Sequence, residues 1–103
     1  MSKTLAPELL PAAHKYDIPG LKTLCEDAIA SNLKIDNASE FFSLAELHDA
    51  TQLRLAAKQF IVTQFYDVKR TDGWKSLQST SPQLTEEIIE ELAELVRQLK
   101  LPY

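Results

Sequence analysis

A chain of 103 residues, 45% of them hydrophobic and 25% charged, is long enough for one globular domain and one core. Its net charge of −4 argues against binding to nucleic acid, because affinity for duplexes comes largely from cationic contacts to phosphate. The apolar runs are too short to span a membrane, and the N-terminus lacks the apolar stretch of a signal peptide. The single cysteine excludes an internal disulfide and is typical of an intracellular compartment.

Apolar residues at helical spacing predict a first helix over Pro7–Tyr16, in which Pro11 either introduces a kink or marks the true start. A second helix is predicted to begin after Asp17, which would be its N-cap, with Pro19 in the first turn. It should continue to about Leu33, because the apolar stripe ends there.

An antiparallel pair of helices is predicted next, Asp36–His48 and Ala50–Gln64, with Asp36 as the first cap. Asp49 followed by Gln52 is typical of a capping box at the start of the second helix of this pair. Both helices are apolar on two sides, which indicates either burial between layers or a surface offered to a partner. The residues expected to face the core are Leu53, Ala56 and Phe60.

The C-terminal part begins with the turn sequence Thr71-Asp72-Gly73 and a short helix, Trp74–Gln78, in which Trp74 is either a core anchor or an exposed binding aromatic. Ser81, with Pro82 at the first helical position, predicts the start of a last helix that reaches Lys100. Its main apolar stripe consists of Leu84, Ile88, Leu92, Leu95 and Leu99, and all of these except Leu95 are expected to dock on the domain near Trp74. This stripe is widened to about half of the circumference by Ile89, Ala93 and Val96. The glutamates expected to face away are Glu86, Glu87, Glu90, Glu91 and Glu94.

These elements predict an all-α fold of about six to seven helices, stacked as antiparallel pairs. Catalysis is not expected, because no nucleophile is paired with a base and the two histidines, His14 and His48, read as surface or corner residues. Cys25 lies on an apolar stripe and is expected in the core. Metal ligands and cofactor sites are likewise not expected, because no cluster has ligand spacing and no glycine-rich phosphate loop is present.

The strings 9–16 (LLPAAHKY), 44–48 (LAELH) and 73–76 (GWKS), in this order, resemble the C-terminal region of speckle-type POZ protein-like MATH–BTB family members. The segments 9–16 (LLPAAHKY), 21–22, 25–28 and 31–33 are similar to the last helices of a BTB/POZ domain. The segments 44–48 (LAELH) and 52–53 resemble the stretch that follows in this family. Asp67-Val68, Thr71, the string 73–76 (GWKS) and the helix 82–93 resemble its BACK-like region. Pro11 departs from the family's pattern, which keeps a helix-compatible residue there.

The resemblance implies three parts: residues 1–35 from the end of a BTB/POZ domain, a three-box-like hairpin at 36–64, and BACK-like helices at 65–103. It implies a non-enzymatic part of a substrate adaptor for a cullin-3 ubiquitin ligase, acting in the nucleus or cytoplasm. The three-box segment itself would be residues 36–62 of this hairpin and would bind cullin-3. The C-terminal helices would self-associate. The BTB sheet and the MATH domain are absent, so the chain is expected to be a fragment of a longer adaptor or a shortened relative.

Two surfaces follow from these expectations. The cullin-facing surface is predicted to consist of Phe41 or Phe42, whichever points outward, with Leu44, Leu47 and Leu55. The self-association surface is predicted on the last helix, at Ile89, Ala93 and Val96. The alternative function is a structural oligomerisation or regulatory domain that does not bind cullin-3.

Overall fold

The computed structural model describes residues 6–99, and this part of the chain contains seven α-helices and no β-strand. The helices are α1 Ala6–Lys15, α2 Pro19–Ala30, α3 Ala38–Leu47, α4 Thr51–Thr63, α5 Phe65–Val68, α6 Asp72–Thr80 and α7 Pro82–Leu99. The predicted all-α fold is therefore confirmed. None of the described helices combines the length and the apolar character that crossing a membrane requires. Lys100, the predicted end of the last helix, lies outside the described residues.

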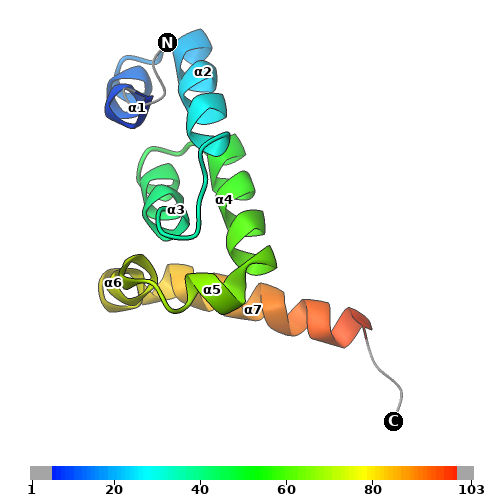
Figure 1. Ribbon diagram of the computed structural model, residues 1–103. Helices are drawn as coiled ribbons and strands as arrows, with labels where there is room; N and C mark the ends of the chain where they lie inside the picture. The colour runs from blue at the N-terminus through cyan, green and yellow to red at the C-terminus, as the bar shows by residue number, and fades with distance from the viewer. Residues whose placement is uncertain (1–5, 100–103) are drawn as a thin grey trace.

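The helices form two stacked hairpins and a C-terminal layer (Figure 1). The hairpin α1–α2 lies at one end and α3–α4 in the middle, with α2 packed against α4. At the other end α6 packs against α3, and α7 crosses the end of α4. The described part measures 53 × 25 × 22 Å, and its radius of gyration of 14.6 Å exceeds the about 13 Å of a compact domain of this size. The fold is therefore elongated along the stacking direction.

Both hairpins turn through the same backbone motif. At the end of α1, the Ile18 amide donates to the Ala13 carbonyl, and Asp17 adopts the left-handed conformation with φ 53°. At the end of α3, the Ala50 amide donates to the Ala45 carbonyl, and Asp49 has φ 52°. These bonds define Schellman C-caps, which normally place glycine at the left-handed position.

The predicted N-caps Asp17, Asp36 and Asp49 are therefore wrong. Asp17 and Asp49 end the preceding helices, and the residue before α3 is Asn37, whose side chain makes no cap bond. The first turn of α4 is instead capped from another helix, because the Leu53 amide donates to Glu26 Oε1 on α2 at 2.9 Å. Glu26 is buried, although a glutamate in the interior of a helix carries no sequence signal for this role.

The predicted start of the last helix is confirmed, whereas α6 begins at Asp72, inside the predicted turn 71–73, and ends at Thr80. Thr71 caps α6, because its hydroxyl accepts a hydrogen bond from the Trp74 amide at 3.1 Å. Pro82 is the first residue of α7. Pro11 lies inside α1 rather than at its start, so the helix runs through the proline.

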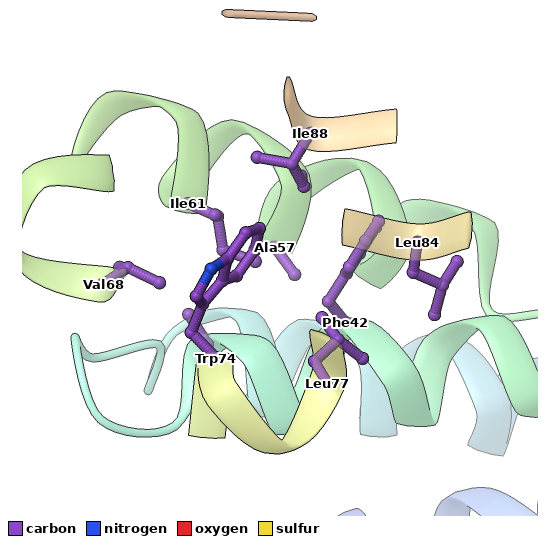
Figure 2. Packing of buried hydrophobic residues seen from close by; sticks show 9 residues of the cluster. Phe42, Ala57, Ile61, Val68, Trp74, Leu77, Leu84 and Ile88 are labelled. Atoms are coloured by element: carbon purple, nitrogen blue, oxygen red, sulfur yellow. The ribbon is translucent and has the colours of Figure 1, made fainter. Parts of the chain in front are cut away.

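The described residues form two hydrophobic clusters rather than one core, and α3 and α4 contribute to both. The first joins the two hairpins and contains Ala6, Leu10, Cys25, Ile29, Ala45, Ala50 and Leu53. Cys25 is fully buried in it, as predicted. The second joins α3–α4 to the C-terminal helices and contains Ala38, Phe42, Ala57, Ile61, Val68, Trp74, Leu77, Leu84 and Ile88 (Figure 2).

Trp74 is the predicted anchor of the second cluster: its ring is buried and meets Phe65 edge-on at 5.1 Å. Leu53 faces the core as predicted, but Ala56 and Phe60 are only half-buried. The buried face of α4 is shifted by one residue, to Ala57 and Ile61. This shift occurs because α7 and α6 cover that side, a tertiary contact that the pattern of α4 alone does not contain.

An ion-pair network fastens α7 to the central hairpin. Arg54 on α4 donates through Nε to Glu46 at 2.6 Å and through Nη1 and Nη2 to Glu87 at 2.8 and 2.5 Å. Lys58 lies 3.2 Å from Glu87 and 3.5 Å from Glu91. The expectation that Glu87 and Glu91 face away from the protein is therefore wrong. Because the Arg54 guanidinium stabilises the charged form, the pKa of Glu87 is held below its usual value.

Candidate protein-interaction surfaces

A groove of about 610 Å³ runs along the outward face of α3, between the start of α1 and α6. Its lining residues on α3 include Phe41, Leu44 and Leu47. Leu47 is 73% exposed, and Phe41 and Leu44 are half-buried. The walls come from Pro7 and Glu8 on α1 and from Gly73, Ser76, Leu77 and Thr80 on α6. We call this the α3 groove.

The structure decides between the two phenylalanines predicted for this surface. Phe42 is fully buried in the second cluster, with the Arg54 guanidinium 5.1 Å from its ring centroid. It is therefore excluded from any surface, and Phe41 is the outward residue.

Leu55 is separated from the other predicted cullin-facing residues. It lies on α4, 57% exposed, in a crease with Val62 and with Leu95 of α7. The structure thus brings Phe41, Leu44 and Leu47 together and places Leu55 in a different depression.

The α3 groove has an unusual polar atom at its base. Ser39 lies along the groove and is buried, and its Oγ has no hydrogen-bond partner among the described residues. An unpaired buried hydroxyl costs free energy, and such groups in native proteins call for a functional or structural explanation. Sequence reasoning missed Ser39, since a serine within a helix is usually exposed.

The second surface is the outer part of α7, which extends beyond the central hairpin (Figure 1). The predicted residues Ile89, Ala93 and Val96 are all exposed there. Leu92 packs partly against the second cluster, but Leu99 is 72% exposed and Leu95 is also exposed. The expectation that Leu99 docks near Trp74 is therefore wrong, because α7 extends beyond the helices on which it packs.

The side chains that could act as nucleophiles or metal ligands are not gathered in one site among the described residues. Cys25 is buried, and burial together with the neighbouring Glu26 carboxylate raises the pKa of its thiol, which disfavours the reactive thiolate. In residues 6–99 no group of three or more histidine, cysteine or acidic side chains is placed to hold a metal ion. The two histidines do lie together, with ring centroids 5.8 Å apart, a juxtaposition that their spacing in the sequence does not reveal.

The sequence of the chain is similar to those of several TD and POZ domain-containing proteins. It is 38% identical over 92 residues to TD and POZ domain-containing protein 2 of Mus musculus, an alignment that covers 89% of this chain and 25% of the relative. It is 43% identical over 83 residues to TD and POZ domain-containing protein 5 of the same organism, covering 81% and 24%. TD and POZ domain-containing protein 1 is 40% identical over 92 residues, covering 89% and 25%. No protein-family model matches the chain.

The chain is therefore related to POZ domain-containing proteins, and the alignment includes most of its described helices. It spans about a quarter of the length of these curated relatives. The BTB/POZ part of the predicted resemblance is supported in this way.

Proposed function

We propose that the chain is a non-enzymatic interaction module of a cullin-3 ubiquitin ligase adaptor of the speckle-type POZ, MATH–BTB kind. It would act inside the cell, in the nucleus or cytoplasm. The α3 groove is the observation that carries this proposal, because it presents an exposed apolar stripe on the hairpin that the resemblance assigns to cullin-3 binding. A partner helix that inserts apolar side chains between α1 and α6 would cover Phe41, Leu44 and Leu47.

The test is binding of the intact chain to the cullin-3 N-terminal domain, measured by titration calorimetry. Leu47→Glu should weaken binding by tenfold or more, because a charge would be desolvated in the groove without a partner. Leu55→Glu is the matched control, since it introduces the same charge at an exposed leucine outside the groove. It should leave the affinity within about twofold of wild type. Equal effects of the two variants, or no binding by the wild-type chain, would contradict the proposal.

A second candidate function, self-association through α7, is favoured by the exposed ridge of Ile89, Ala93 and Val96. The first helix cannot cover this ridge, because α1 lies at the opposite end of the molecule (Figure 1). A small residue at the centre of a helical ridge allows close approach of a second copy, and two-fold pairing is the commonest arrangement.

Sedimentation at micromolar concentration tests this second function. Wild type should sediment above monomer mass, and Ile89→Glu should sediment as a folded monomer. Gln83→Glu, which adds the same charge to α7 at an exposed polar position, should associate like wild type. Self-association without cullin-3 binding would favour the alternative of a structural or regulatory domain. A monomeric wild type would exclude self-association through α7.

A further inference from the structure

A cluster of nitrogen groups lies where the two hairpins meet. His14 is in the last turn of α1 and His48 directly follows α3, and their rings meet edge-on at 5.8 Å. Lys22 of α2 joins them: its Nζ lies 3.5 Å from His14 Nδ1 and donates a hydrogen bond to the Asp49 carbonyl at 2.9 Å. Three side chains that can each carry a positive charge thus lie next to one another.

The surrounding charges do not neutralise this cluster. The charged groups on the adjoining parts of the packed elements are Lys15, Asp17, Glu26, Glu46, Asp49 and Arg54. Glu26 accepts from the Leu53 amide, and Glu46 is paired with Arg54. Within residues 6–99, neither imidazole forms an ion pair with a carboxylate.

The neutral form of His48 is accordingly favoured in the folded protein. Burial, and then the positive potential of His14 and Lys22, hold the pKa of His48 below its ordinary value. The ends of α1 and α3 act in the opposite direction, since a helix C-terminus favours a charged imidazole. With a lowered pKa, the separated state binds more protons than the docked state, so docking weakens as the pH falls through about 6.5 and is strongest above it.

We propose that His14, His48 and Lys22 form a pH-responsive joint that weakens the docking of the α1–α2 hairpin on the α3–α4 hairpin on mild acidification. Protonation of His48 would place a positive charge against Lys22 across the contact between the two hairpins. The Lys22 bond to the Asp49 carbonyl and the Glu26 cap on α4 are the polar links that separation would break. This inference does not depend on the proposed partner of the chain.

Hydrogen exchange of the Leu53 amide gives a direct readout, because its described partner is Glu26 on the other hairpin. Between pH 7.5 and 5.5, after correction for intrinsic exchange, its protection factor should fall about threefold or more. The Leu77 amide, inside α6 in the second cluster, should keep its protection. In the same samples, the ring protons of His48 should titrate with a midpoint below about 6.5.

The matched control is the double variant His14→Gln, His48→Gln, which keeps polar side chains but cannot acquire charge. It should lose the pH dependence of Leu53 protection. An equal fall in protection in the variant and wild type would overturn the proposal. A His48 midpoint at or above the ordinary value, or unchanged Leu53 protection in wild type, would overturn it as well.

Discussion

At the scale of single residues, Phe42 on α3 and Phe60 on α4 lie in different environments. Phe42 is fully buried among α4, α6 and α7, whereas Phe60 is half-buried along an open depression with Ala30 and Leu33. The two side chains have the same chemistry, so the free energy of each truncation should follow its burial.

We expect Phe42→Ala to lower the free energy of unfolding by about 3–5 kcal/mol, the range for a buried phenylalanine. Phe60→Ala should cost about 1–2 kcal/mol, because part of its surface already contacts water. The sequence pattern had placed Phe60 in the core, where the loss of a buried phenylalanine would be expected. Denaturant melts of both variants measure the difference, and a larger loss for Phe60→Ala would contradict the assigned packing.

At the scale of elements, the corners of the two hairpins share one backbone conformation. Asp17 and Asp49 occupy left-handed positions in two successive Schellman motifs, where a side chain on Cβ is strained. A residue at such a position can be tested by changing only its backbone freedom.

Asp49→Gly should raise the free energy of unfolding by about 0.5–1 kcal/mol, because glycine adopts φ 52° without strain. Asp49→Val should lower it by about 1–2 kcal/mol, since a β-branched residue is least tolerant of this conformation. If Asp49 were an N-cap, the glycine variant would be slightly destabilising instead. Thermal unfolding of the two variants, with the same pair of changes at Asp17, distinguishes the two roles by sign.

At the scale of the whole molecule, the position of α7 depends on a polar link as well as on the second cluster. Arg54 connects Glu46 of α3 with Glu87 of α7 and stacks on the Phe42 ring. The partners are partly exposed, so solvent screening reduces the strength of each pair.

Removal of this link should have a modest effect at neutral pH and change the response to acid. Arg54→Met should lower the free energy of unfolding by about 1–2 kcal/mol at pH 7. The pKa of Glu87 is lowered in the folded state, so its contribution is present above about pH 4.5 and is lost as the pH falls through the folded value. The difference between wild type and Arg54→Met should therefore shrink below about pH 4, as measured by denaturant melts across this range. A constant difference would show that Arg54 acts through packing alone.

Much of the fold could be predicted from local pattern. Apolar spacing locates the described helices other than α5, the Ser81-Pro82 pair marks the start of α7, and the apolar stripe of α2 identifies Cys25 as a core residue. These features depend on residues within one or two turns of each other, so a single sequence contains them.

The candidate surfaces depended on tertiary contacts. Whether Phe41 or Phe42 points outward, and which glutamates of α7 face solvent, is determined by where α6 and α7 pack on the central hairpin. The same is true of the Glu26 cap, since a carboxylate on α2 meets an amide of α4 that lies 27 residues later in the chain.

The sequence by itself determined the all-α class and the approximate extent of the described helices other than α5, and it showed which family of domains they resemble. Only the tertiary structure decided that Leu55 is separated from Leu47, that Leu99 extends past the body, and that His14 meets His48. The physical reason is that helical periodicity specifies the direction of a side chain around its own axis. It does not specify which neighbouring helix covers that direction, because this depends on corner geometry and on packing between segments far apart in the chain.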